Sequence, residues 1–201
     1  MSDPQRLAAQ IAFIAELDKL KTVLRQTPLI DGSRRETDAE HSWHAAMMAL
    51  LLAEHADEAI NPLRAAKMLL IHDVVEIDAG DTFIYDTVAQ ADQGAREQKA
   101  ADRLFGMLPA DQEAELRALW DEFEAKDTAD ARYAGAIDRF APMLNNHLSG
   151  GLGWKANKVR PEQVFALNAP RIGAASASLW DYAKRMVEAS VARGDFPEVT
   201  P

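Results

Sequence analysis

Apolar residues recur at helical spacing from the start of the chain. In the first segment they lie three or four residues apart, which predicts an amphipathic helix that ends before Pro28. Its apolar positions are Leu7, Ile11, Ile14, Leu17, Leu20 and Leu24. The stretch 29–37 is polar and predicts a loop, after which Thr37 or Asp38 can cap a second helix that runs to about Asp57. Because that helix is apolar almost all round, we expect it to lie centrally.

The rest of the chain continues the helical pattern. Asn61 followed by Pro62 is typical of an N-cap with proline at the first helical position, and predicts a third helix to about Ile71. Further helices are expected over residues 87–107, from Pro109 onward, over 129–144, and over 161–193 as one or two segments with a break at Pro170. The total is about seven or eight helices and no strand. The expected fold class is therefore all-α, a single compact helical bundle.

The glycine-rich stretch 150–153 is the clearest flexible break, but it does not mark a domain boundary. Helices on both sides of it have apolar faces that need a partner. We therefore expect one domain over residues 1–201, with the C-terminal helices of 161–193 packed on the rest. A chain of 201 residues, of which 48% are hydrophobic, is long enough for one sizeable core.

Composition narrows the possible partners. Asp and Glu number 32 against 22 Lys and Arg, and the net charge of −10 disfavours nucleic-acid polymers and anionic lipid as partners. The absence of cysteine excludes disulfides and thiolate metal sites, and is compatible with the cytoplasmic location that we expect. Residues 1–19 lack the apolar core of a signal peptide, and the longest apolar run, 45–53, is too short to span a bilayer. No membrane partner is expected.

The pair His72-Asp73 is the first candidate for chemistry. It ends the apolar run 68–71, where an ionisable pair is costly to bury unless something compensates it. A divalent cation would compensate both side chains at once, and imidazole with carboxylate ligands suits Mn, Co, Fe, Ni or Zn. Taken alone, such a dipeptide is more often a capping or hydrogen-bonded pair at a helix end.

The surroundings of this pair favour the metal. His41 lies at the expected start of the second helix, and Asp138 lies on an otherwise apolar helix face. Glu76 stands about one helical turn beyond Asp73 and can point into the same cavity. Asp81 follows in the loop that turns back. Together these positions predict a metal site with further carboxylates beside it.

The order of these residues resembles that of the HD-domain metal phosphohydrolases. The segments ETDAEHSWHAA, HDVVEIDAGD and AIDRFAPMLNN are similar to the branch that includes bacterial 5′-deoxynucleotidases, and the resemblance covers about residues 17–153. It implies an all-helical HD-domain fold with a metal-binding core in that range. The implied metal ligands are His41, His72, Asp73 and Asp138. The resemblance also implies that Glu76 and Asp81 handle the attacking water and the leaving-group proton, with the two roles open to exchange.

The histidine count bears on the number of metal ions. No histidine lies between Asp73 and Asp138. Two-metal enzymes that resemble this core take extra histidines from that region. The resemblance therefore implies one divalent ion, of identity Mn, Co, Fe, Ni, Zn or Mg.

Arginines near the predicted site are candidates for binding phosphate. Arg34 and Arg35 precede His41 in a loop that can close over the site, and the planar guanidinium fork suits phosphate; a solvated loop arginine is the alternative. The resembled deoxynucleotidases carry an Arg-Trp pair before Pro-Leu, and that tryptophan helps to reject ribose. Here Thr27 replaces the tryptophan and Arg25 is displaced by one residue. The preference between ribo- and deoxyribonucleotides therefore stays open.

The sequence predicts a metal-dependent phosphohydrolase that acts on a nucleoside 5′-monophosphate or a similar small phosphomonoester through a metal-activated water. One alternative is a phosphodiesterase or pyrophosphohydrolase that acts on a signalling nucleotide. Another is a metal-stabilised interaction module without turnover. By resemblance a homodimer is expected, with the apolar faces of the C-terminal helices as a possible interface.

Overall fold

Helices dominate the computed structural model, which describes residues 4–198. The helices of ten or more residues in this range are α1 (Pro4–Leu17), α2 (Asp38–Leu51), α3 (Pro62–Ile71), α5 (Gln93–Phe105), α6 (Ala110–Ala125), α7 (Ala129–Leu148), α9 (Pro161–Gly173) and α10 (Ala177–Arg193). Shorter elements are α4 (Glu76–Ala79), α8 (Leu152–Ala156), the 3-10 turns η1 (Asp18–Thr22), η2 (Ala53–His55), η3 (His72–Val75) and η4 (Ala89–Ala91), and the strands β1 (Leu24–Pro28) and β2 (Arg35–Thr37). The all-α class and the number of long helices are confirmed.

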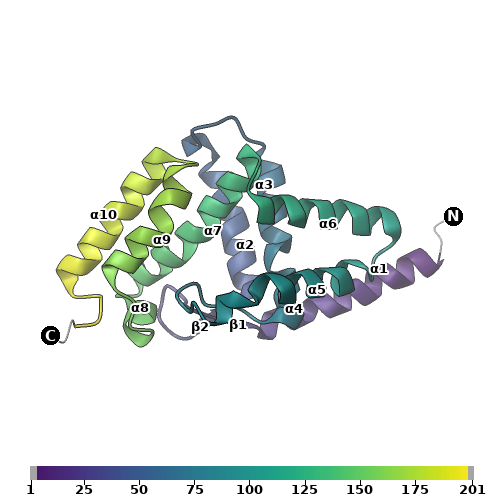
Figure 1. Cartoon of the computed structure of the whole chain (residues 1–201), viewed down its shortest axis with the longest axis horizontal. Coiled ribbons are helices and arrows are strands. Elements are labelled where there is room, and N and C mark those ends of the chain that lie inside the picture. The colour runs from purple at the N-terminus through teal and green to yellow at the C-terminus, as the bar shows by residue number, and fades with distance from the viewer. Residues whose placement is uncertain (1–3, 199–201) are drawn as a thin grey trace.

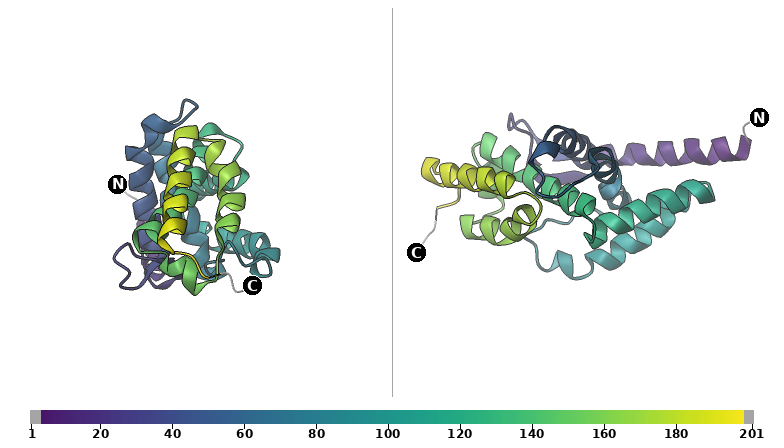
Figure 2. Two further views of the ribbon diagram at one scale, coloured as in Figure 1. Left: turned by 90° about the vertical axis from the view of Figure 1, so that its left-hand side faces the viewer. Right: turned by 90° about the horizontal axis from the view of Figure 1, so that it is seen from above.

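The helices are arranged along one long axis. Helices α2, α3 and α7 lie in the middle, α9 and α10 form one end, and α1, α5 and α6 extend at the other (Figures 1 and 2). Helix α2 packs against α3 and α7, and α7 also packs against α9 and α10. The central position expected for the second helix is confirmed. None of the helices within residues 4–198 is long and apolar enough to cross a membrane.

The prediction of no strand was wrong. The first helix was expected to continue to Pro28, but α1 ends at Leu17 and the chain passes through η1 into β1, which pairs antiparallel with β2. A residue before proline is biased toward extended backbone, and Thr27 precedes Pro28. Gly32, with φ of +71°, lies in the turn that joins the two strands. This hairpin brings residues 24–28 beside the start of α2.

Other helix boundaries also moved. Helix α5 begins at Gln93 rather than near residue 87, because the preceding segment forms turns and η4. Pro170 lies inside α9, and the break falls after Gly173 instead. Ser176 then caps α10 by accepting a hydrogen bond from the Leu179 backbone N–H.

Two apolar cores meet near the middle of the chain. The larger one fills the space between α2, α3, α7, α9 and α10. The second joins Phe13 and Leu20 to α5 and to Trp120 of α6. The indole Nε1 of Trp120 donates to the backbone carbonyl of His72 at 3.1 Å. Turn η3 is therefore held where the two cores adjoin, and its position determines where the His72-Asp73 pair lies.

Helix α2 begins with the predicted cap. The Thr37 hydroxyl accepts from the Glu40 backbone N–H at 3.3 Å, and the Glu40 carboxylate accepts from the Thr37 backbone N–H at 2.9 Å. This capping box satisfies two backbone donors that a helix start otherwise leaves free. It also sets the direction in which the first turn of α2 enters the core.

We expect Thr37→Ala to lower the free energy of unfolding by about 1 kcal/mol, because it removes the cap from the central helix. Urea denaturation monitored by circular dichroism measures the change. Thr87→Ala, at an exposed position in a turn, is the control. Equal stability of the two variants would contradict the role assigned to the cap.

Candidate metal centre

The first turn of α2 carries His41 into the interior, where its side chain is fully buried. Its Nε2 lies 3.0 Å from Oδ1 of Asp138 on α7, and its Nδ1 lies 3.6 Å from Oε1 of Glu36 on β2. Burial and the nearby Arg25 charge act to lower the pKa of His41, but the two carboxylates outweigh them and raise it to about 9. The carboxylates of Asp138 and Glu36 therefore stabilise the protonated form of this imidazole.

Turn η3 presents the second imidazole to the same point. His72 Nδ1 donates to the Leu69 carbonyl at 2.8 Å, which leaves Nε2 as the ring nitrogen with a free lone pair. That Nε2 lies 3.0 Å from Oδ1 of Asp73 and 3.5 Å from Oδ1 of Asp138. A backbone carbonyl that fixes the tautomer in this way is the usual support for a metal-binding histidine.

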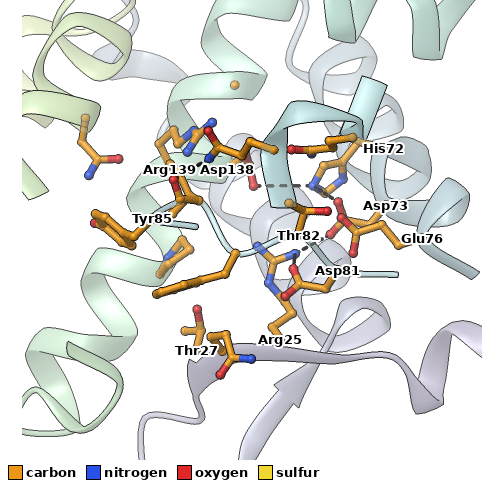
Figure 3. Close-up of a pocket in the computed structure, with 18 of the residues that line it drawn as sticks. Arg25, Thr27, His72, Asp73, Glu76, Asp81, Thr82, Tyr85, Asp138 and Arg139 are labelled. Atoms are coloured by element: carbon orange, nitrogen blue, oxygen red, sulfur yellow. Dashed lines mark hydrogen bonds and ion pairs between the residues drawn. The ribbon is translucent and has the colours of Figure 1, made fainter. Parts of the chain in front are cut away.

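Asp138 joins the two histidines. Burial acts to raise its pKa, but the hydrogen bond with His41 Nε2 and the electrostatic influence of the two histidine rings hold the pKa well below its usual range. Figure 3 shows Asp138 directed toward His72, with Asp73 and Glu76 on the far side of the imidazole. Four predicted ligands from three separate elements therefore converge.

The donor set fits a divalent cation. Ligand atoms of His41, His72 and Asp73 all lie within 4.8 Å of one another. Nε2 of His72 is buried and has no hydrogen-bond partner among the described residues. Two imidazoles with carboxylate oxygens suit a borderline or hard divalent ion. The residues present thus match the chemistry of such an ion.

Arg25 is the main residue of this site that sequence reasoning did not place there. Strand β1 carries it inward, and its Nη1 lies 2.7 Å from Oδ2 of Asp73, 3.5 Å from Oδ1 of Asp38 and 3.9 Å from Oδ1 of Asp81. Its Nε lies 3.4 Å from Oε1 of Glu36. Figure 3 shows this side chain rising from the strand toward Asp81. One guanidinium therefore lies among four carboxylates.

Asp38, Glu76 and Asp81 form a second acidic group, with ligand atoms within 4.8 Å of one another. Asp38 is fully buried, and neither of its carboxylate oxygens has a hydrogen-bond partner among residues 4–198. Burial and the Asp73 charge raise the pKa of Asp38 to about 7. Burial, with Asp73 and Asp38, raises the pKa of Glu76 well above its usual range, and burial also raises the pKa of Asp81. A carboxyl whose pKa is raised to about 7, as in Asp38, can hold or release a proton near neutral pH.

The clusters open into a cavity of about 260 Å³. His72, Asp73, Glu76, Asp81 and Asp138 line it, together with Arg25, Thr27 and aromatic residues that include Phe83, Tyr85 and Trp154. Arg34 and Arg35 are not among its lining residues. Arg34 is exposed and pairs with Glu40 instead. The structure thus brings together the six predicted metal and catalytic residues, and does not bring the two predicted phosphate-binding arginines to them.

Arg25 and Asp38 were both missed, but only Arg25 had a signal in the sequence that could have indicated its position. Arg25 could have been found from the sequence, because Pro28 biases the residue before it, Thr27, toward extended backbone. Side chains on an extended strand alternate between two faces, so Arg25 and Thr27 share one face. Asp38 carried no such signal. An acidic residue in the first turn of a helix is ordinary, because it favours the helix dipole.

Comparison with known proteins places this geometry in context. A family model described as an HD domain matches residues 17–180. The 5′-deoxynucleotidase HDDC2 of Bos taurus is 33% identical over 135 residues, which cover 67% of this chain and 64% of that protein. A 5′-deoxynucleotidase of Erwinia tasmaniensis is 30% identical over 77% of this chain and 82% of that protein. The matched region thus spans less than two thirds of the HDDC2 relative's length.

A solved structure shows the same fold. The predicted metal-dependent phosphohydrolase from Magnetospirillum magnetotacticum MS-1 is 58% identical, with a TM-score of 0.91, over 96% of this chain and 97% of that chain. A conserved hypothetical protein from Pyrococcus furiosus, at 23% identity and a TM-score of 0.65, shares the fold alone. The expected resemblance and fold are confirmed by these matches.

We expect Arg25→Met to lower the free energy of unfolding of the chelator-treated protein by about 3 kcal/mol or more. The substitution leaves buried carboxylates without their cation, which is costly in a region of low polarity. Urea denaturation in the presence of chelator measures the effect. Arg34→Met is the matched control, and little change is expected because exposed ion pairs contribute little. Equal effects of the two substitutions would contradict the compensation argument.

Proposed function

The chain belongs to the HD domain family, and from this premise we propose that it is a metal-dependent phosphohydrolase of a nucleoside 5′-monophosphate or a similar small phosphomonoester. The observation that carries the proposal is the convergence of His41, His72 and Asp73 within 4.8 Å, with Asp138 at 3.0 Å from His41, at the wall of a cavity. Relatives named 5′-deoxynucleotidase, and a similar structure of a predicted metal-dependent phosphohydrolase, support it.

One divalent ion held by His41, His72, Asp73 and Asp138 is part of the proposal. The candidates are Mn, Co, Fe, Ni, Zn and Mg. A single ion is favoured because the second acidic group, Asp38, Glu76 and Asp81, contains no histidine, whereas the first group supplies two imidazoles.

When bound, the ion supplies positive charge to the phosphoryl oxygens and lowers the pKa of a coordinated water. Arg25 adds a second positive charge at the same wall of the cavity, 2.7 Å from Asp73. Its planar donors suit phosphate oxygens. We assign it the role that the sequence suggested for Arg34 and Arg35, which lie outside the cavity lining.

Asp81 and Glu76 are the proposed catalytic residues. Both line the cavity beside the metal-ligand cluster. Asp81 is half-buried at the start of the loop and is the candidate that orients or deprotonates the attacking water. Glu76 is buried on α4 and is the candidate that passes a proton to the leaving alkoxide. The two roles remain open to exchange.

Thr27 bears on the choice of sugar. It is buried in β1 and lines the cavity, where its small side chain leaves more room than a tryptophan would (Figure 3). We therefore propose that ribonucleotides are accepted alongside deoxyribonucleotides. The expected discrimination is less than about tenfold, because rejecting one added hydroxyl by size alone is weak.

The homodimer and the cytoplasmic location remain predictions. The apolar residues Leu179, Met186 and Val187 of α10 are buried within the chain, so they are not free to form an interface. Exposed apolar side chains are more numerous on α1 and α2 (Leu7, Ile11 and Ile14, and Trp43, Met47, Leu50 and Leu51) than on α9 and α10 (Leu167, Tyr182 and Val191). We propose these faces as the more suitable interface, and the molar mass in solution tests whether a dimer forms.

We expect phosphate release from monoesters to depend on a divalent metal. The protein is stripped with chelator, and each candidate metal is added singly with ribo- and deoxyribonucleoside 5′-monophosphates, sugar phosphates and a diester. Asp73→Ala should lower the metal-restored rate on the order of a hundredfold or more, because the site loses a ligand. Absence of release from every monoester by folded, metal-loaded protein would remove the monoesterase proposal; nucleotide or pyrophosphate products from other substrates would favour the alternative hydrolases.

We expect Glu76→Gln to lower kcat by about a hundredfold or more, because it removes an acid–base group but keeps the shape of the side chain. Metal content and melting temperature should stay as in the unmodified protein. Glu97→Gln, at another buried carboxyl of the cavity wall, is the control and should retain most turnover. If Glu76→Gln instead strips the metal or unfolds the chain, the site is structural and the interaction-module alternative gains.

A further inference from the structure

Three cationic side chains line the cavity apart from Arg25. Lys126 follows α6, Arg139 lies on α7 and Arg171 lies near the end of α9. Neither Arg139 nor Arg171 forms an ion pair or hydrogen bond with any residue in the described range 4–198. In contrast, Arg25 lies within 4 Å of four carboxylates. The cavity therefore has one compensated cation and a separate group of uncompensated cations.

Arg139 is half-buried, and a buried arginine is ordinarily paired. Burial acts to lower its pKa, and the positive charges of Arg171 and Arg25 act in the same direction. Asp138 and Tyr85 act in the opposite direction. Figure 3 shows Arg139 on the side of Asp138 that faces away from His72, near Tyr85. Its guanidinium is thus directed away from the metal-ligand cluster.

Lys126 is held toward the cavity at a cost. It has a φ of +57° at the C-terminal end of α6, where glycine is usually favoured. Its Nζ lies 3.1 Å from the centroid of the Phe123 ring and donates to the Phe123 carbonyl. A Cβ on Gly135 would meet Lys126 Cε at 2.8 Å, so this glycine makes room for the lysine. Burial, opposed by Glu124, lowers the pKa of Lys126 to about 8, and Arg171 and Arg139 add to that lowering.

Like charges gathered in a partly buried cavity repel one another unless an anion lies between them. Glu124 also lines the cavity, but it is exposed and forms no ion pair with these cations in the described structure. Aromatic residues Phe83 and Tyr85, whose ring centroids lie 5.2 Å apart, line the same cavity. An organic molecule with two anionic groups could place one beside the metal-ligand cluster and the other among Lys126, Arg139 and Arg171.

We propose that Lys126, Arg139 and Arg171 form a second anion subsite, which takes a phosphate group other than the one that is hydrolysed. The substrate class is then a small phosphomonoester that carries a second phosphate group on the same sugar or nucleoside. This inference rests on the proposed phosphohydrolase function for the identity of the first phosphate. The subsite itself is tested by binding without turnover.

Matched pairs of substrates test the subsite by kinetics. The pairs are adenosine 5′-monophosphate with adenosine 3′,5′-bisphosphate and with adenosine 2′,5′-bisphosphate, and fructose 6-phosphate with fructose 1,6-bisphosphate. For at least one pair, kcat/KM should be about tenfold or more higher for the bisphosphate, since charge-assisted hydrogen bonds to phosphate are strong. In Arg139→Gln and in Arg171→Gln this ratio should fall toward one. Arg185→Gln, an equal charge change at an exposed position of α10 outside the cavity lining, should keep it.

Calorimetric titration of the same pairs into chelator-treated protein separates the subsite from the reaction. Tighter binding of a bisphosphate that is lost in Arg139→Gln or Arg171→Gln, but kept in Asp73→Asn, supports the subsite even if no metal restores turnover. Arg171 is exposed, so its variant carries the test if Arg139→Gln fails to fold. No preference for any bisphosphate in kinetics or binding would overturn the proposal. A preference that both variants retain would overturn it as well.

Discussion

The buried charges around Arg25 and the two histidines are the constraint on which the rest of the structure depends. Asp73 lies 2.7 Å from the Arg25 guanidinium, while Asp138 lies 3.0 Å from the His41 ring. Charge removed from water costs several kcal/mol per ion unless opposite charge meets it in good geometry. Arg25 offsets only part of this charge, because it forms no ion pair with Asp138 and leaves Nε2 of His72 without a hydrogen-bond partner in the described structure. A bound divalent cation would offset the remainder, which links the stability of the site directly to its proposed chemistry.

The fold can be understood as the means of bringing these charges together. The hairpin β1–β2 delivers Arg25, the capped start of α2 delivers His41, turn η3 delivers His72 and Asp73, and α7 delivers Asp138. Trp120 fixes η3 through the His72 carbonyl, so the smaller apolar core supports the site as well as the larger one. Because the elements come from distant parts of the chain, the site exists only in the folded protein. The same α7 that carries Asp138 presents Arg139 on another side, which gives the cavity two distinct charged regions.

Local signals in the sequence were sufficient to predict the starts of two central helices. The Thr37 cap and the Asn61-Pro62 helix start were predicted because each depends on neighbouring residues with a known physical role. The set of four metal ligands, which lie far apart in the sequence, came from the resemblance to a known family. The β1–β2 pairing was missed, since the apolar spacing up to Leu24 also fits a helix and the strand is stabilised by a partner strand later in the chain, where Leu24 pairs with Thr37 and Pro28 with Arg35. The wrong choice of arginine followed from that error. Strand β1 places Arg25 inward beside Asp73, whereas Arg34 pairs with Glu40 at the surface. Asp38 could not be recognised, because an acidic first turn is common in helices that have no such cluster.

The most direct test of the account is to locate the ion. Crystals grown with Mn²⁺ would be measured at the manganese absorption edge, and the anomalous difference map computed. The account predicts one strong peak within bonding distance of His41 Nε2, His72 Nε2 and carboxylate oxygens of Asp73 and Asp138. A peak between Asp38, Glu76 and Asp81 instead, or no peak at either group in fully loaded crystals, would contradict it.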